Sequence, residues 1–132
     1  MNIALIASDT RKSLMQSLCV AYHHIFSQHT LFATGTTGML IEKAANLHVH
    51  KYLSGRLGGE KQICAQISNN EIDMVIFLRD PESPDYARSH AEILRLCDSH
   101  KIPLATNLAT AELLILALER GDLEWRSLYN PG

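Results

Sequence analysis

The chain has 132 residues, of which 46% are hydrophobic and 20% are charged, and its formal net charge is −2 at pH 7. Its length indicates one domain with a real hydrophobic core, and its near-neutral charge provides no basic surface for nucleic acid or an anionic membrane. No apolar run approaches membrane-spanning length, and three widely separated cysteines indicate reduced thiols in a cytoplasmic protein.

Short apolar runs alternate with helical patterns along the whole chain. In chain order we predict strand 2–7, helix 12–26, strand 30–33, helix 37–45, strand 49–53, helix 59–68, strand 74–78, helix 90–99, strand 103–106 and helix 110–120. Residues 74–78 are apolar at every position, as a strand buried on both faces requires. The alternation predicts an α/β fold: a single-domain, doubly wound, five-stranded parallel sheet with helices on both faces.

The last ten residues form a separate segment in this interpretation. The predicted domain covers residues 1–122, and residues 123–132 form a C-terminal tail that contains Trp125, Leu128 and Tyr129. These side chains are too apolar for a loose end, so we expect the tail to pack on the body of the domain or on a neighbouring subunit.

Two loops combine glycine with hydroxyl side chains, and each leads from a predicted strand into a predicted helix. Residues 33–38 read Ala-Thr-Gly-Thr-Thr-Gly, and residues 54–60 read Ser-Gly-Arg-Leu-Gly-Gly-Glu. Glycine lets backbone N–H groups approach an anion, and a helix N-terminus favours negative charge. Simple turns and helix caps would also account for the first loop. The two loops together favour a small phosphorylated ligand, and Glu60 is the first candidate for a catalytic group.

Other polar residues follow the predicted strands and therefore meet at the carboxyl edge of the sheet, where such folds bind ligands. Lys12 is at the start of its helix, where the helix dipole disfavours a cation, and a bound anion would relieve that conflict. Asp9 and Asp80 are candidates for proton transfer. Each also has a structural explanation: Asp9 as a helix cap, Asp80 as a turn former, Glu60 as a dipole partner and Lys12 as a solvated helix residue.

Seven histidines raise the question of a metal site. His48 and His50 share one face of a predicted strand, but the sequence offers no third ligand at a suitable spacing, so no metal site is predicted.

The sequence resembles the methylglyoxal synthase family over about residues 2–115. The resemblance depends on 4–7 with Asp9 and Lys12, 33–38, 53–55 with 57–59, Gln62, 75–81 and 102–107. It implies conversion of dihydroxyacetone phosphate to methylglyoxal and inorganic phosphate, without a metal or organic cofactor, usually by a homohexamer.

The resemblance also implies roles for individual residues. The phosphate would be held by Lys12, Thr34, Gly35, Thr36, Thr37, Ser54 and Gly55. Glu60 would remove a proton beside the carbonyl, forming an enediol phosphate that expels phosphate. Asp9 and Asp80 would belong to the hydrogen-bond network around the reacting carbons.

The departures from the family pattern cluster around this chemistry. Glu60 replaces the family's aspartate, Arg56 replaces a proline, and Ser8 replaces a histidine. The family's Pro-His-x-Pro-Asp run has no clear counterpart in residues 82–90, which are one residue shorter, and His90 or Tyr86 could act as the electrophile instead. The sequence therefore predicts a lyase with Glu60 as its base; the alternative is a catalytically weak or inactive paralogue that binds a phosphorylated metabolite.

Overall fold

The computed structural model of the chain describes residues 1–54, 57–84, 86 and 90–126. Within these ranges the strands are β1 (Asn2–Ala7), β2 (Thr30–Ala33), β3 (Val49–Lys51), β4 (Met74–Leu78) and β5 (Leu104–Ala105). The helices are α1 (Lys12–Ala21), α2 (His23–Phe26), α3 (Gly35–Ala45), α4 (Gly59–Ser68), α5 (Ala91–Ser99) and α6 (Leu108–Glu119), and a 3-10 helix covers Asp9–Arg11.

The strands form one parallel sheet in the order β3-β2-β1-β4-β5. The two central strands pair along their length, from Ile3 opposite Met74 to Ala7 opposite Leu78. Every residue of β4 is buried, because helices cover both faces of the sheet. The predicted fold class is thus confirmed.

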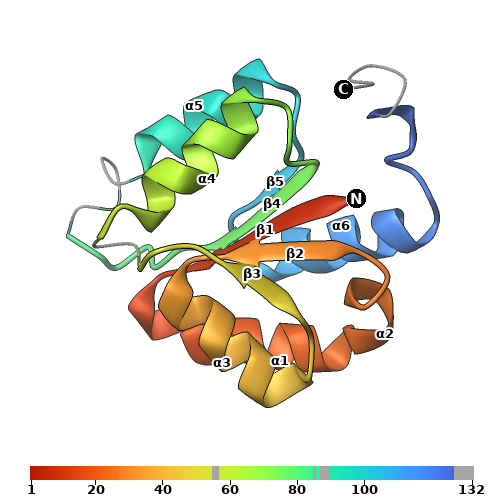
Figure 1. The fold of residues 1–132 in the computed structure, drawn as a ribbon, viewed down its shortest axis with the longest axis horizontal. Coiled ribbons are helices and arrows are strands. Elements are labelled where there is room, and N and C mark those ends of the chain that lie inside the picture. Colours follow the sequence, from red (N-terminus) through yellow and green to blue (C-terminus); the bar gives the residue numbers. More distant parts are fainter. Residues whose placement is uncertain (55–56, 85, 87–89, 127–132) are drawn as a thin grey trace.

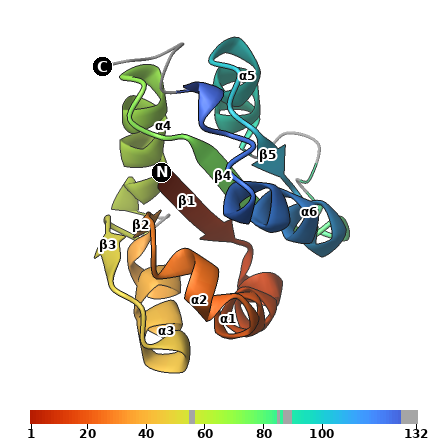
Figure 2. The same ribbon diagram turned by 90° about the vertical axis from the view of Figure 1, so that its right-hand side faces the viewer.

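Alternation along the strands divides the core into two layers. Ile3, Leu5 and Ala7 face one cluster, formed with α1, α2, α3 and α6, while Ala4 and Ile6 face the other, formed with α4 and α5. Figures 1 and 2 show the same division, with α4 and α5 on one side of the sheet and the remaining helices on the other.

Most element boundaries agree with the sequence prediction, and the main difference lies in the first helix. The predicted helix 12–26 is interrupted at Tyr22, where φ is −112° and ψ is 29°, and a short α2 then carries Ile25 and Phe26 into the core. The helical spacing of apolar residues continues across Tyr22, so the sequence pattern does not reveal that the helix is interrupted at this one residue. Helices α3 and α6 begin two residues earlier than predicted, α5 one residue later, and strands β3 and β5 are shorter.

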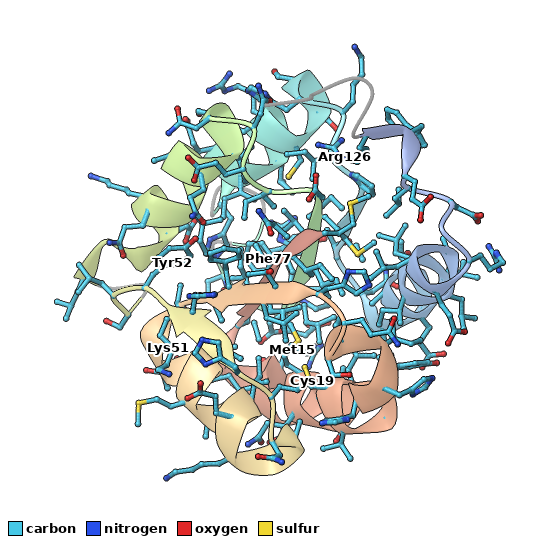
Figure 3. All side chains as sticks on the ribbon, turned by 45° about the vertical axis from the view of Figure 1, so that its right-hand side comes forward. Met15, Cys19, Lys51, Tyr52, Phe77 and Arg126 are labelled. Atoms are coloured by element: carbon cyan, nitrogen blue, oxygen red, sulfur yellow. The ribbon has the colours of Figure 1, made fainter. Side chains whose placement is uncertain are left out.

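The described part of the C-terminal segment packs on the body of the domain. Leu123 joins the core cluster of α1 and α6, and Arg126 is only 2% exposed. Figure 3 shows Arg126 on the opposite side of the sheet from Met15 and Cys19. Leu128 and Tyr129 lie outside the described residues.

Candidate functional site

The strand order places the candidate site at the carboxyl edge of β1 and β4. The chain progresses outward from β1 toward β3 and from β4 toward β5, so the connections diverge between these two strands, as at the ligand crevice of doubly wound folds. The loops after the two strands are joined here: the Ser8 N–H donates to the Leu78 carbonyl at 3.0 Å, and the Asp80 N–H donates to Ser8 Oγ at 3.3 Å.

A cleft of about 650 Å³ opens beside this edge. Its volume is within the usual range for small-molecule sites. The residues that line it come from five separate segments of the chain: Ile6, Ala7, Ser8, Asp9, Lys12, Thr34, Thr36, Ser54, Glu60, Phe77 and His90. Eight of these residues are candidates from the sequence, so the fold brings together groups that are up to 82 positions apart (from Ser8 to His90).

Lys12 forms the cationic part of the cleft. Its Nζ donates to the Ala7 carbonyl at 2.8 Å and to Thr37 Oγ1 at 3.2 Å, and it lies 3.5 Å from Asp9 Oδ1. The side chain is only 19% exposed. These contacts hold the ammonium group between the end of β1 and the first turn of α3, and the N-terminus of a helix also attracts anions.

The first glycine loop starts α3. Thr34 is the N-cap residue, with φ −64° and ψ 156°, but its side chain makes no capping hydrogen bond, and it lines the cleft. The Gly35 N–H donates to the Leu53 carbonyl at 3.3 Å. A Cβ at Gly38 would lie 2.6 Å from Lys51 Cγ, so the packing of α3 against β3 accounts for a glycine at this position.

The second glycine loop starts α4 and carries Glu60. Gly58 has φ +102°, a conformation that glycine adopts without strain. A Cβ at Gly59 would lie 1.9 Å from the Leu53 carbonyl oxygen, which leaves no space for any larger residue. Gly55 and Arg56, two of the candidate residues, lie outside the described part of the chain.

Glu60 is paired with His90. The Nδ1 atom of His90 lies 2.7 Å from both carboxylate oxygens of Glu60, and each side chain is 28% exposed. The imidazole packs edge-on against Phe77, with the ring centroids 4.5 Å apart. The carboxylate is thus at the wall of the cleft, in contact with the imidazole of His90.

The two aspartates differ in their surroundings. The Asp9 side chain is 81% exposed, whereas Asp80 is 19% exposed and accepts hydrogen bonds from the Glu82 N–H and from Thr10 Oγ1, each at 2.9 Å. These two hydrogen bonds lower the pKa of Asp80 below its ordinary value, so the group is ionised at neutral pH. Asp80 lines an adjoining cleft of about 200 Å³, which shares Ser8, Asp9 and His90 with the larger one.

Two contributors to this region were not expected from the sequence. Thr10 anchors Asp80, and its only sequence signal is its position two residues after Ser8 in the loop that follows β1. Phe77 supports His90, but within an apolar strand it has the pattern of an ordinary core residue.

The cysteines do not provide a nucleophile. Burial raises the pKa of Cys19 to about 12, that of Cys97 to about 12 and that of Cys64 to about 11. All three thiols therefore remain protonated at neutral pH.

The described residues contain neither a metal-binding cluster nor a membrane-spanning helix. Among the described residues, no group of three or more His, Cys, Asp or Glu side chains is arranged to hold a metal ion. Across the same part of the chain, none of the helices has the length and apolar character needed to traverse a lipid bilayer.

Comparisons with known proteins identify the family. Residues 15–106 match the model of the MGS-like domain. The methylglyoxal synthase of Caldicellulosiruptor saccharolyticus is 59% identical, over 99% of this chain and 94% of the relative, and that of Oceanobacillus iheyensis is 52% identical, over 97% and 92%. The crystal structure of methylglyoxal synthase from Elizabethkingia anophelis NUHP1 superimposes with a TM-score of 0.79 at 37% identity, covering 86% of this chain and 76% of that one. The chain therefore belongs to the methylglyoxal synthase family.

Proposed function

We propose that this chain is a methylglyoxal synthase, a carbon–oxygen lyase that converts dihydroxyacetone phosphate to methylglyoxal and inorganic phosphate. The observation that carries the proposal is the single cleft in which Lys12 and the start of α3 face a carboxylate, Glu60. An anion site beside a base suits a substrate with a phosphate group at one end and an acidic C–H bond next to its carbonyl. Close relatives named methylglyoxal synthase support the same function, and the alternative of an inactive binding module is not favoured.

In this proposal the phosphate group is bound first. Lys12 supplies the positive charge, and hydroxyl and amide groups of both glycine loops surround the phosphate oxygens: Thr34, Gly35, Thr36, Thr37, Ser54 and Gly55. Binding of the phosphate at this end leaves the three-carbon part of the substrate directed toward Glu60.

Glu60 then acts as the general base. Its carboxylate takes a proton from the hydroxymethyl carbon beside the carbonyl. The electron pair of that C–H bond forms a carbon–carbon double bond, and the carbonyl oxygen takes up a proton to give an enediol phosphate. The terminal hydroxyl group then loses its proton, the double bond shifts toward the phosphate-bearing carbon, and the C–O bond breaks, so that phosphate leaves with the bonding pair and takes up that proton. The remaining enol tautomerises to methylglyoxal. The elimination needs no oxidant or reductant. Ser8, Asp9 and Asp80 contribute to the hydrogen-bond network beside the reacting carbons.

The cellular setting of this enzyme is also part of the proposal. Reduced cysteines agree with a cytoplasmic location. The resemblance to the family suggests a homohexamer, and sedimentation of the purified chain would measure the number of subunits.

A turnover assay tests the function. Purified protein supplied with dihydroxyacetone phosphate is expected to release methylglyoxal and phosphate in equal amounts. Glu60→Gln should lower kcat by about 100- to 10,000-fold, the usual contribution of a general base. Glu92→Gln is the matched control, because Glu92 is 61% exposed on α5 and pairs with Arg95. Wild-type protein that forms no more methylglyoxal than the Glu60→Gln variant would contradict the proposal.

A further inference from the structure

The contact between Glu60 and His90 joins two departures from the family pattern. Glu60 is one methylene longer than the family's aspartate, and His90 lies in the altered loop region that ends at α5. His90 Nδ1 lies 2.7 Å from each oxygen of Glu60, so a single ring nitrogen contacts both sides of the carboxylate. A proton on Nδ1 would let the imidazole donate to this carboxylate, whose two oxygens would each retain a further lone pair.

The backbone of His90 is in an uncommon conformation. Its φ is +66° and its ψ is 19°, in the left-handed region. The other non-glycine residues with positive φ in the described part of the chain are Asn46, Asn70 and Lys101, and each of them follows the end of a helix, where this conformation is common. His90 instead precedes a helix, where extended backbone is the rule and where left-handed geometry is unfavourable for a residue with a Cβ.

The side chain of His90 also does not serve the helix that it precedes. It is the N-cap residue of α5 but makes no capping hydrogen bond. Its ring is held on one side by Phe77, which is fully buried in the core, and its Nδ1 is directed at Glu60. The left-handed backbone and the missing cap thus coincide with the orientation of this imidazole toward the carboxylate, a pattern typical of functional sites.

We propose that His90 is a positioning residue that fixes the Glu60 carboxylate for proton abstraction. The inference depends on the proposed function of Glu60. A glutamate has one more rotatable bond than an aspartate, so its carboxylate samples more positions, and a misplacement of about 1 Å can lower a rate by about 100-fold. The hydrogen bond from His90 holds the longer side chain in one of these positions, so the two departures from the family pattern compensate for each other.

Two substitutions at His90 separate the imidazole from the backbone. His90→Gly removes the ring but favours positive φ, and His90→Asn tolerates positive φ and retains an amide donor close to the place of Nδ1. We expect His90→Gly to lower kcat by about 10- to 100-fold with KM changed less than about twofold, and His90→Asn to restore most of the loss. His48→Asn, at a 78% exposed histidine, is the control and should retain the wild-type rate.

An isotope effect distinguishes positioning from a purely structural role. With substrate deuterated at the hydroxymethyl carbon, the primary isotope effect on kcat should rise in His90→Gly, because proton abstraction becomes more rate-limiting. A double-mutant comparison is the second test. The shorter carboxylate of Glu60→Asp should not reach His90 Nδ1, so the double variant Glu60→Asp/His90→Gly should differ from Glu60→Asp alone by less than about twofold in kcat.

Each outcome is decisive. An active wild-type enzyme whose kcat is unaffected by His90→Gly would overturn the inference and leave the proposed function intact. Equal losses in His90→Gly and His90→Asn, or a full loss from His90→Gly on top of Glu60→Asp, would also overturn it. Absence of turnover in the wild type would contradict the proposed function itself, and this role of His90 with it.

Discussion

Lys12 occupies a position that its own helix makes unfavourable. Its ammonium group lies at the start of α1, where the helix dipole repels a cation, and it is held there by the Ala7 carbonyl and Thr37 Oγ1. Two neutral oxygens and the more distant Asp9 carboxylate, at 3.5 Å, leave the ammonium group able to attract a phosphate. The proposed substrate therefore supplies the counter-charge that the site needs.

Replacing Lys12 tests this assignment. Lys12→Met should raise KM for dihydroxyacetone phosphate by about 10- to 100-fold, because a hydrogen bond to a charged group contributes about 1.5–3 kcal/mol. Inhibition by inorganic phosphate should weaken by a similar factor, as measured by steady-state kinetics. Lys43→Met, at an exposed lysine on the last turn of α3, is the control. An unchanged phosphate inhibition constant in Lys12→Met would contradict the assignment.

For individual residues of the cleft, the sequence predicts which of them converge but not how their side chains contact one another. Lys12, Thr34 and Glu60 were predicted to meet because each follows a parallel strand, and strand order alone brings such positions together. The contact of Glu60 with His90 depends on the left-handed backbone of one residue in an irregular loop. No periodic pattern of residue types indicates such a conformation, so this part of the site required the structure.

Among the elements, α4 positions the proposed base through the tight junction at its start. Gly58 provides the positive φ, and Gly59 lets the chain pass against the Leu53 carbonyl. Each of these two glycines thus has a local structural reason, and Glu60 follows directly as an acidic residue in the first turn, where the helix dipole favours it.

Gly59→Ala measures how closely this junction is packed. Alanine normally stabilises a helix relative to glycine by about 1 kcal/mol. Here its Cβ would be 1.9 Å from the Leu53 carbonyl oxygen, and relief of such an overlap requires a backbone shift that costs about 1–3 kcal/mol beyond that gain. We expect a lower melting temperature and, because Glu60 is displaced, a lower kcat.

Ser68→Ala, at the exposed last residue of the same helix, is the control for that experiment. It should leave both the melting temperature and kcat near their wild-type values. A melting temperature of Gly59→Ala at or above that of the wild type would show that the junction has room for a side chain.

Arg126, the last described residue, attaches the C-terminal segment to the body of the molecule and has one of the most buried side chains. Its guanidinium donates to the Lys101 carbonyl at 2.5 Å and to the Ile72 carbonyl at 3.4 Å, and its Nε lies 3.5 Å from Asp73 Oδ1. These groups belong to the loops that precede β4 and β5, so one side chain joins the C-terminal segment to two places in the sheet.

Arg126→Met should therefore destabilise the fold without changing the residues that line the cleft. Removing the guanidinium takes away one hydrogen-bond donor from each of two carbonyls and the cation beside Asp73, at a cost of about 2–4 kcal/mol in the free energy of unfolding, measured by urea denaturation. Arg120→Met is the control: its guanidinium is 64% exposed and pairs with Asp122, and such surface pairs contribute at most about 1 kcal/mol. Equal stability of the two variants would contradict a structural role for the buried arginine.

The pairing of β1 with β4 determines what the chain exposes while it is being synthesised. At about 5–20 residues per second, the 71 residues that separate Asn2 from Asp73, which are hydrogen-bonded in the finished fold, take about 4–14 s to emerge. During that interval β1 is an apolar edge strand whose backbone groups on one side have no partner. Such an edge readily pairs with another nascent chain. The strand at the centre of the finished sheet is thus open to such pairing until β4 has been synthesised.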